Sequence, residues 1–403
     1  MFARLPAIPA GARAAAAALL WSRAVVWAAG LLGLASFGRD AGWRGFDPAG
    51  LTVPFGAVGD ALIAPAARWD AVWFLVVADA GYDDAARPAF FPLYPSLVSG
   101  AGWLIGSRAL AAILVAAACA LVALVLLHEL ARHELGERYA RPAVLVCAFF
   151  PTSLFLTAMY SESLFLALAL GAFLAARREA WWLAGLAAAL AAATRSAGVT
   201  LAVPLVLLCL EQHGWRPSWR LIPAALLPPL GLAGYCAFLA ASGLDPLAPF
   251  DAQDVWLRSF AGPFMGAWDG TVAAVGGARQ LLSGSRVPVY FTDAGGDPFE
   301  VARRTLTDFA FLVFAAVACA GALRRLPLAY GAWAVAALAL PLSYPVEPQP
   351  LMSLGRFVLV LFPLHLWVAA VLVDRGATER WLAVSGGLLA ITSAQFAAWE
   401  FVG

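Results

Sequence analysis

The chain contains neither lysine nor asparagine, and only 13% of its 403 residues are charged. A soluble globular domain carries about 25% charged residues, whereas 63% of this chain is hydrophobic and its mean hydropathy is +0.81. These values exclude a soluble globular protein and predict an integral membrane protein. The net charge of +1 excludes both a basic nucleic-acid-binding surface and an acidic tail.

The missing residue types also indicate origin and processing. Without asparagine the chain has no acceptor for N-glycosylation. Abundant alanine and arginine, with arginine replacing lysine throughout, indicate a GC-rich genome, so we expect a bacterial and in particular an actinobacterial protein. The cysteines lie inside apolar runs without paired spacing, which predicts buried thiols rather than disulfides or metal ligands; they are Cys119, Cys147, Cys209, Cys236 and Cys319.

Apolar runs of the length needed for membrane spans recur along the chain, since a span takes roughly 20 apolar residues. They lie near 14–35, 107–127, 142–158, 160–176, 180–194, 197–211, 221–241, 305–323, 327–343, 355–373 and 381–401. The runs predict one all-α polytopic domain over residues 1–403 with about eleven transmembrane helices. Two long loops separate them, at 36–106 and 242–304, and an interfacial or re-entrant helix near 90–106 would not change the orientation.

Arginines predict the orientation in the membrane, because short cytoplasmic loops are enriched in them. Pairs and triplets of arginine flank the short loops near 132–141, 177–178, 216–220, 324–325 and 375–380. If all of these loops are cytoplasmic, the N-terminus lies inside and both long loops lie outside. We therefore expect a multi-pass plasma-membrane protein with its long loops on the extracytoplasmic side.

Polar residues that interrupt apolar runs away from the arginine-rich loops then share the outer side. They are Asp70, the segment Tyr160-Ser161-Glu162-Ser163, Arg195 and Arg356. Ionisable groups near the hydrocarbon are costly and usually functional, so their shared side predicts one polar site. The alternative is that each of these polar residues lies at a helix end in contact with water. That alternative readily explains one such residue, but it explains four on the same side less well. Arg23, inside the first run, is an exception to which we assign no role.

A site on the outer side receives its activated group through the membrane, because nucleotides are made in the cytoplasm. The sequence has neither a phosphate-binding P-loop nor a dinucleotide-binding glycine fingerprint, so a lipid phosphate is the natural carrier. Sugar transfer from such a carrier needs a carboxylate that accepts the acceptor's proton and cations that hold the departing phosphate. Asp70 and the pair Arg195 and Arg356 supply these groups.

Four short motifs resemble one known family, the PIG-V transferases that add the second mannose to GPI anchors. Trp69-Asp70-Ala71, with Gly81-Tyr82 and Ala89-Phe90-Phe91-Pro92, resembles the first of them. Tyr160-Ser161-Glu162 matches the family's Tyr-Ser-Glu element, Arg195-Ser196-Ala197-Gly198 resembles its Arg-Ser-Asn-Gly element, and Arg356-Phe357 resembles its C-terminal arginine. The motifs occur in the family's order over nearly the whole chain.

The resemblance implies a GT-C glycosyltransferase that is metal-independent and inverting and uses polyprenyl- or dolichyl-phosphate-mannose as donor. It places the catalytic base at Asp70 and the substrate-binding residues at Trp69, Tyr94, Tyr160, Glu162, Arg195 and Arg356. Ala197 departs from the eukaryotic asparagine, which puts the GPI acceptor in doubt. A mannolipid, a lipoglycan or a secreted protein is the acceptor we expect.

Other carboxylates rank behind Asp70 as the base, in the order Glu162, Asp60 and Asp79, and the adjacent Asp83 and Asp84 fit a solvated loop. Carboxylates suit Mg²⁺ or Mn²⁺, so a divalent metal is compatible with the acidic cluster, but the arginines make it unnecessary and we predict no cofactor. The aromatic residues near Asp70 either stack on sugar and hold a prenyl chain or form an interfacial aromatic belt.

Two other functions stay open from the sequence. One is a GT-C transferase for another prenyl-phosphate sugar, which the sequence cannot distinguish because substrate pockets differ subtly. The other is a lipid or glycolipid transporter, which would need polar residues deep in several helices and broken helices near the midplane. The charges here lie mainly at helix ends, so the enzyme is favoured. His128 and His133 do not have the spacing of a zinc motif.

Overall fold

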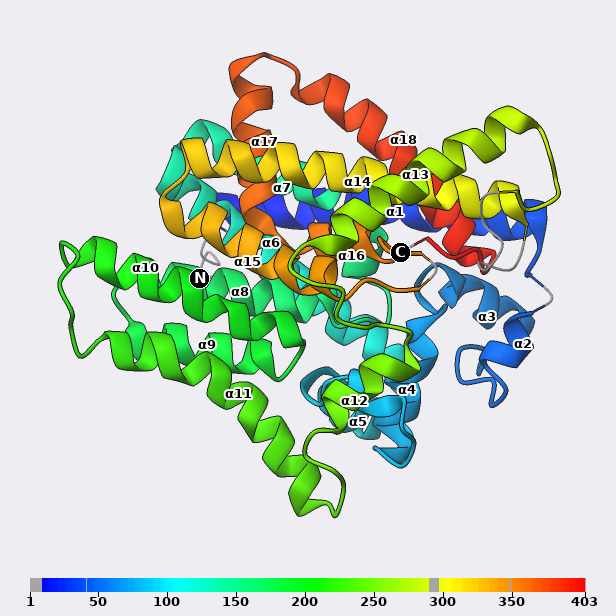
Figure 1. Cartoon of the computed structure of the whole chain (residues 1–403), viewed down its shortest axis with the longest axis horizontal. Coiled ribbons are helices and arrows are strands. Elements are labelled where there is room, and N and C mark those ends of the chain that lie inside the picture. Colours follow the sequence, from blue (N-terminus) through cyan, green and yellow to red (C-terminus); the bar gives the residue numbers. More distant parts are fainter. Residues whose placement is uncertain (1–8, 41, 290–296, 348, 403) are drawn as a thin grey trace, which may run out of the picture.

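The computed structural model describes residues 9–40, 42–289, 297–347 and 349–402, which are helical apart from turns and one isolated antiparallel bridge between Arg258 and Val346. Among the described residues, four helices are long and apolar enough to cross a membrane: α1 (Ala10–Phe37), α6 (Arg108–Leu135), α11 (Leu221–Ala241) and α14 (Pro298–Arg325). In Figure 1 long helices run side by side across the molecule. The described residues confirm an all-helical, multi-span membrane protein.

The remaining predicted runs also coincide with helices, but these are shorter or broken. They are α7 (Glu137–Ala148), α8 (Glu162–Arg177), α9 (Trp181–Ala192), η4 (Ser196–Leu201) with α10 (Ala202–Gln212), α15 (Leu328–Ser343), α16 (Leu354–Leu359), α17 (Phe362–Asp374) and α18 (Thr378–Ala397). Length and composition identify four spans, or up to five with one bent pair. The count of about eleven crossings therefore stays a prediction based on the apolar runs.

The first long loop is largely helical rather than extended. It contains α2 (Trp43–Phe46), α3 (Gly56–Ile63), η1 (Ala64–Ala66), α4 (Asp70–Ala80), η2 (Arg87–Ala89) and α5 (Leu93–Ile105). The segment 56–66 and α4 together are apolar enough for a span, but they meet at an angle of 108°. The bend falls immediately before Asp70, so this residue opens a helix inside a broken segment.

The second long loop is also helical over most of its described residues. It contains α12 (Ala248–Val255) and α13 (Met265–Ser283), and α14 begins at Pro298, while residues 290–296 lie outside the described residues. Helix α13 packs along α14, and α12 lies beside η2 near α4 and α5 (Figure 1). The loop thus places α12 against the first long loop.

Small residues let the helices approach closely, as is common in membrane proteins. A Cβ atom added at Gly231 of α11 would lie 2.1 Å from the carbonyl oxygen of Ala189 in α9, and one at Gly185 of α9 would lie 2.5 Å from the carbonyl oxygen of Pro223. The α9–α11 contact therefore depends on glycine in both helices.

Arg23, to which the sequence assigned no role, points into the protein rather than to the surface. Its guanidinium group donates to the carbonyl oxygen of Ser153 (2.6 Å), the Ser153 hydroxyl (3.0 Å) and the Thr157 hydroxyl (3.0 Å). It also reaches the carbonyl of Ala148 at 3.4 Å, where α7 ends. Because carbonyls at a helix end lack intrahelical partners, Arg23 stabilises the break between α7 and α8.

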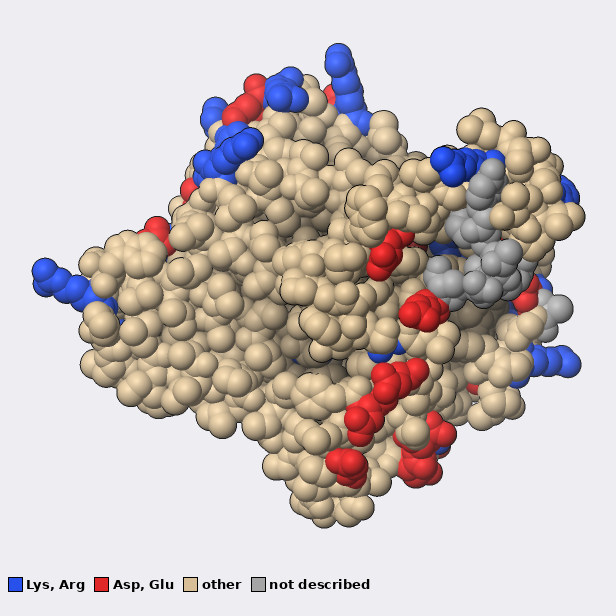
Figure 2. All heavy atoms as spheres, viewed as in Figure 1, with Lys and Arg blue, Asp and Glu red and all other residues tan. Residues whose placement is uncertain are grey.

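Charged groups occupy two separate regions of the surface (Figure 2). Arginines and some acidic residues lie at the left and upper left of the view, over the turn that joins α10 to α11 and near α17. Acidic residues gather at the centre and lower right, over α12 and the first long loop, and further arginines lie at the right. The surface between the two regions is nearly uncharged. This distribution fits a hydrocarbon band between two polar ends.

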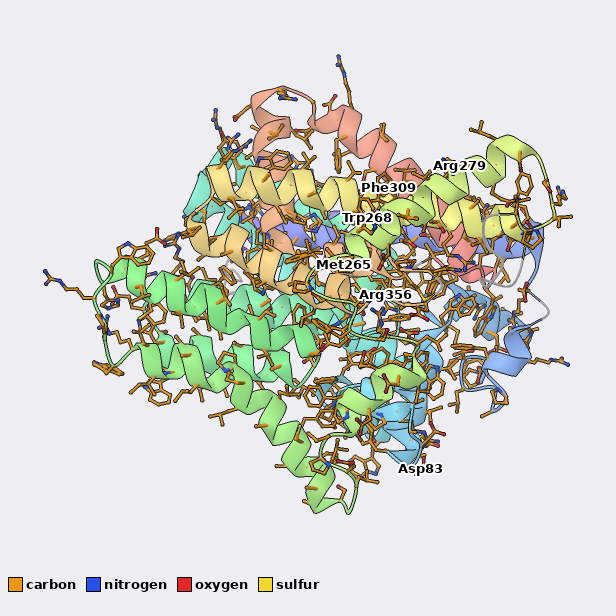
Figure 3. All side chains as sticks on the ribbon, in the orientation of Figure 1. Asp83, Met265, Trp268, Arg279, Phe309 and Arg356 are labelled. Atoms are coloured by element: carbon orange, nitrogen blue, oxygen red, sulfur yellow. The ribbon has the colours of Figure 1, made fainter. Side chains whose placement is uncertain are left out.

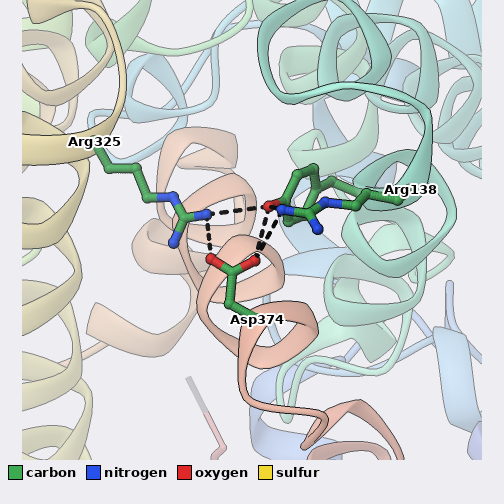
Figure 4. A network of polar contacts seen from close by, with 4 residues as sticks. Arg138, Arg325 and Asp374 are labelled. Carbon is green, nitrogen blue, oxygen red and sulfur yellow. Dashed lines mark hydrogen bonds and ion pairs between the residues drawn. The ribbon is translucent and has the colours of Figure 1, made fainter.

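At the arginine-rich end a polar network joins three helices (Figure 4). Arg325 of α14 donates to Asp374 of α17 at 2.5 Å, and Arg138 of α7 reaches the same carboxylate at 3.3 Å. The Tyr139 hydroxyl donates to Asp374 at 2.7 Å. The network ties α7, α14 and α17 together at this end of the molecule.

Candidate active site

The site is a cavity of about 470 Å³ between the broken helices and α12. Its charged lining residues are Asp70, Glu162, Arg195, Arg258 and Arg356. Its apolar lining comes from several elements and includes Phe90, Phe91, Leu232, Phe250, Trp256, Leu340 and Phe357. In Figure 3 Arg356 lies near the centre of the molecule, below α13. The cavity therefore combines a cluster of charges with an extensive apolar wall.

Ion pairs join the four charged residues that the sequence predicted. Arg356 Nη1 donates to Asp70 Oδ2 at 2.6 Å. Glu162 Oε1 lies 2.7 Å from Arg195 Nη1 and 3.3 Å from Arg356 Nε. Glu162 is only 1% exposed, so it bridges the two arginines inside the protein. The structure brings these four residues together, and their catalytic roles stay predictions.

Asp70 owes its position to the strained residue before it. Trp69 has φ 56°, an unfavourable value for a bulky residue. The Tyr160 hydroxyl spans this turn: it donates to the Arg68 carbonyl at 2.9 Å and accepts from the backbone N–H of Asp70 at 3.0 Å. The fully buried Arg68 donates to the Ala397 carbonyl at 3.0 Å. These contacts fix the turn that directs Asp70 into the cavity.

Both carboxylates occupy the first residue of a helix, Asp70 in α4 and Glu162 in α8. The free backbone N–H groups at a helix N-terminus favour negative charge nearby. The helix ends and the arginines therefore both place positive charge beside these two side chains.

Arg195 lies at the break between α9 and η4, where its own backbone is extended. Gly198, three residues later, packs directly on α9: a Cβ atom there would lie 2.2 Å from the backbone nitrogen of Ala192. Glycine is required at position 198 of this motif because any side chain there would push η4 away from α9 and so displace Arg195.

Arg356 lies on the short helix α16 and is held there by aromatic rings against its side chain and by close packing of the preceding residue. Its guanidinium group lies over the rings of Tyr160 (5.1 Å) and Phe155 (5.5 Å). Gly355 packs on Phe311 and Thr152, and the Thr152 hydroxyl donates to the Gly355 carbonyl at 2.9 Å. Cation–π contacts are strongest when water is excluded, so these rings help to keep Arg356 charged and in place.

Three predicted substrate-binding residues have structural contacts instead of a place in the cavity lining. Tyr94 is fully buried and its hydroxyl donates to the Ala112 carbonyl at 3.1 Å. Trp69 packs on Phe46, Trp399 and Phe401. Tyr160 supports the turn before Asp70. The geometry therefore favours packing and positioning roles for these three residues. The sequence could not distinguish such roles from substrate binding, because it does not show which neighbours surround an aromatic ring.

Phe90 and Phe91 line the cavity, and they do not form an exposed interfacial belt. They are 8% and 5% exposed, and Phe90 stacks on Trp73 with ring centroids 5.8 Å apart. Of the two interpretations from the sequence, the geometry favours contact with a ligand.

The four carboxylates that rank below Glu162 as candidate bases lie outside the cavity lining. Asp60 accepts from the backbone N–H of Phe55 at 2.8 Å, and Asp79 pairs with Arg108 at 2.7 Å. Asp83 pairs with Arg87, and Asp84 accepts from the backbone N–H of Ala86. Within the described ranges no three His, Cys, Asp or Glu side chains are grouped as a metal site. Asp70 and Glu162 are the described carboxylates that line the cavity.

Arg258 is a cavity residue that the sequence analysis missed. It follows α12 in the second long loop, among acidic residues that resemble a solvated loop. Burial and, to a smaller extent, the nearby Arg356 lower the pKa of its guanidinium group to about 10, while Asp70 opposes this shift. The sequence could have predicted helix α12, but it does not show that the fold brings Arg258 next to α16.

Comparison with known proteins supports the resemblance noted in the motifs. Residues 56–213 match the family model described as mannosyltransferase (PIG-V). The GPI alpha-1,6-mannosyltransferase 2 proteins of Rattus norvegicus and Mus musculus are 38% and 37% identical to this chain over 154 residues. These alignments cover 35% of this chain and 31% of each relative, so the match spans about a third of the curated relatives' length. This similarity agrees, over residues 56–213, with the resemblance seen in the motifs.

Two solved structures also resemble the chain, both of the oligosaccharyltransferase of Archaeoglobus fulgidus. One is tethered with an acceptor peptide and the other is in complex with Zn and sulfate. Their TM-scores are 0.40 and 0.43, at 15% and 12% sequence identity. The matches cover 95% and 94% of this chain and 54% and 53% of the solved chains.

Proposed function

We propose that this protein transfers mannose from a polyprenyl-phosphate-mannose donor to a lipid, glycan or protein acceptor, with inversion and with Asp70 as the general base. The observation that carries the proposal is the cavity itself, in which Asp70 and Glu162 face three arginines beside an apolar wall. The match of residues 56–213 to the mannosyltransferase family supports the choice of sugar.

The charges of the cavity balance those of such a donor. Three arginines and two carboxylates among the described lining residues give a net charge of +1. The donor's phosphodiester carries one negative charge, so the complex is neutral. After transfer the phosphate carries two negative charges while Asp70 is protonated, and the total is again neutral. The reaction therefore creates no uncompensated charge in a site that is poorly solvated.

The transfer step follows from this arrangement. The acceptor oxygen attacks the anomeric carbon as its proton passes to Asp70, and the bond from that carbon to the phosphate oxygen breaks with its electron pair staying on the phosphate. One displacement of this kind inverts the anomeric centre. The ion pair of Arg356 with Asp70 weakens as Asp70 is protonated, and Glu162 keeps Arg356 in position.

We place the cavity on the extracytoplasmic side of a bacterial plasma membrane, with the N-terminus inside and about eleven crossings of the GT-C type. The nearly uncharged surface between the two charged regions in Figure 2 supports two polar faces across a hydrocarbon band. The apolar wall from α11, α12 and α15, with Leu232, Phe250 and Leu340, suits a prenyl chain. A donor that resides in the bilayer then reaches the cavity without leaving the lipid.

Asp70→Asn tests the base directly. The variant keeps the size of the side chain but cannot accept a proton, so transfer of labelled mannose from the lipid donor should fall at least about 100-fold. Asp79→Asn is the matched control, because Asp79 lies on the same helix and pairs with Arg108 outside the cavity. Thermal unfolding in detergent verifies that both variants fold. Wild-type turnover in Asp70→Asn would remove Asp70 from the role of base.

A further inference from the structure

The three arginines of the cavity differ in what neutralises them. Arg356 pairs with Asp70 and Glu162, and Arg195 pairs with Glu162. For Arg258, no carboxylate of the described residues lies within ion-pair distance; its Nη1 donates to the backbone carbonyl of Tyr344 at 3.0 Å. The net positive charge of the cavity is therefore located at Arg258.

The backbone around Arg258 is held in place. Arg258 N–H donates to the Gln253 carbonyl at 2.9 Å, which closes the end of α12. The residue forms the isolated bridge with Val346, and the N–H of Glu347 donates to the Leu257 carbonyl at 3.0 Å. These bonds connect the end of α12 to the segment that leads into α16. They present the Arg258 side chain to the cavity from a fixed support.

Two guanidinium groups share one aromatic ring in this part of the cavity. Arg258 lies 5.7 Å and Arg195 5.6 Å from the centroid of Phe357, the residue after Arg356. A ring face attracts each cation, but it does not cancel their mutual repulsion. An anion between two such forks would receive charge-assisted hydrogen bonds from both, and arginine matches phosphate oxygens geometrically.

We propose that Arg258, together with Arg195, which contacts the same Phe357 ring, binds the phosphate of the prenyl-linked donor, and that Arg356 instead holds the two carboxylates in position. The inference rests on the proposed function, because it assigns the phosphate subsite of the same cavity. It changes the assignment made from the sequence, in which Arg195 and Arg356 formed the phosphate-binding pair. Arg356 is already engaged by Asp70 and Glu162, whereas Arg258 has its charge available.

The assignment also predicts how strongly the site holds its product. The released prenyl phosphate carries more negative charge than the donor. An arginine without a paired carboxylate therefore binds this product more tightly than it binds the donor. A lipid phosphate without sugar should therefore compete with the donor, and the competition should depend on Arg258.

The experiment measures binding of farnesyl phosphate, with farnesol as the uncharged analogue, to the purified full-length protein. Arg258→Gln should weaken farnesyl phosphate about 10- to 100-fold, the range of a lost charge-assisted hydrogen-bonding group, and leave farnesol unchanged. Arg258→Lys should restore part of the loss. Arg279→Gln is the matched control, because Arg279 is exposed on α13 away from the cavity lining (Figure 3). In mannose transfer, Arg258→Gln should raise KM for the lipid donor more than it lowers kcat.

The outcomes separate this inference from the proposed function. If the wild-type protein transfers mannose and Arg258→Gln binds farnesyl phosphate as well as Arg279→Gln does, the assignment of Arg258 is wrong and the proposed function stands. If the wild-type protein neither binds farnesyl phosphate nor transfers mannose, the proposed function fails and the assignment fails with it. An equal loss for farnesol would show that the substitution disturbs the apolar wall, and it would also overturn the assignment.

Discussion

Among the single residues of the cavity, Glu162 carries a charged group that is almost completely buried. A carboxylate that is 1% exposed needs compensation, because burying an unpaired charge costs several kcal/mol. Two arginines and the N-terminus of α8 supply it. Replacing either arginine therefore disturbs the other through Glu162, and single substitutions in this network are not expected to be additive.

Tyr160 offers a test of how the turn at Trp69 positions Asp70. Tyr160→Phe removes the hydroxyl that bridges the Arg68 carbonyl and the Asp70 N–H, so the Asp70 N–H loses its acceptor and the Arg68 carbonyl keeps only the N–H of Ala71. We expect a loss of about 1–3 kcal/mol in unfolding free energy. We also expect a fall in kcat of roughly 10- to 100-fold, because small displacements of a catalytic group are costly. Unfolding in detergent and mannose transfer measure the two effects.

Tyr94→Phe is the control for this prediction. Tyr94 is as buried as Tyr160, and its hydroxyl also donates to one backbone carbonyl, that of Ala112, but away from the cavity lining. It should lower stability by a similar amount and leave kcat unchanged. If both variants lose equal activity, the effect of Tyr160 is general destabilisation and the positioning role is wrong.

At the scale of elements, the site lies where helices break. Asp70 follows the bend after η1, Glu162 opens α8 after the irregular segment 149–161, Arg195 precedes η4, and Arg356 lies on α16 just before α17 begins. The apolar runs predicted the interruptions near Glu162 and Arg195, where one run ends and the next begins. They did not predict helix α4 at Asp70, which lies in a predicted long loop, or the end of α16 inside the run 355–373. Hydropathy averaged over a window passes smoothly across a short interruption, and a partner that stabilises a break, such as Arg23, is distant in sequence.

The α9–α11 contact provides a test at this scale. Gly231→Ala places a methyl group against the Ala189 carbonyl, so α11 must shift, and overpacking of this kind costs about 1–3 kcal/mol. Since Leu232 of α11 lines the cavity, mannose transfer should fall as well. Gly234→Ala on the same helix meets no atom within 4 Å, so it should leave stability and transfer near wild type. Equal behaviour of the two variants in unfolding would contradict the proposed dependence on close packing.

For the whole molecule, the sequence allowed prediction that Asp70, Glu162, Arg195 and Arg356 lie together in one polar site. That succeeded because the cost of placing an ionisable group near the hydrocarbon depends on local sequence. The orientation in the membrane stays a prediction. Arg258 could not be found in this way. Its loop resembles solvent-exposed sequence, and it acquires its role only when the bridge to Val346 brings it against Phe357. Which acidic or basic residues become buried is decided by contacts between distant segments.

Sidedness remains the property on which the reaction depends, and labelling of single cysteines tests it. The five cysteines of the described chain are free thiols, so a background without them is needed. In that background Asp254→Cys lies on α12 beside the cavity, and Arg178→Cys lies in an arginine-rich short loop; both positions are exposed. A membrane-impermeant maleimide should label Asp254→Cys in intact cells and Arg178→Cys only after permeabilisation.

The reversed pattern would place the cavity on the cytosolic side, where a donor presented in the outer leaflet could not reach Asp70. Labelling of both positions in intact cells would mean that the two polar ends do not lie across one hydrocarbon band. The expected pattern would instead place the arginine-rich short loops on the cytosolic side, as the positive-inside rule predicts. The cavity would then open on the side where a lipid-linked sugar is the available activated donor, because nucleotide sugars stay in the cytoplasm.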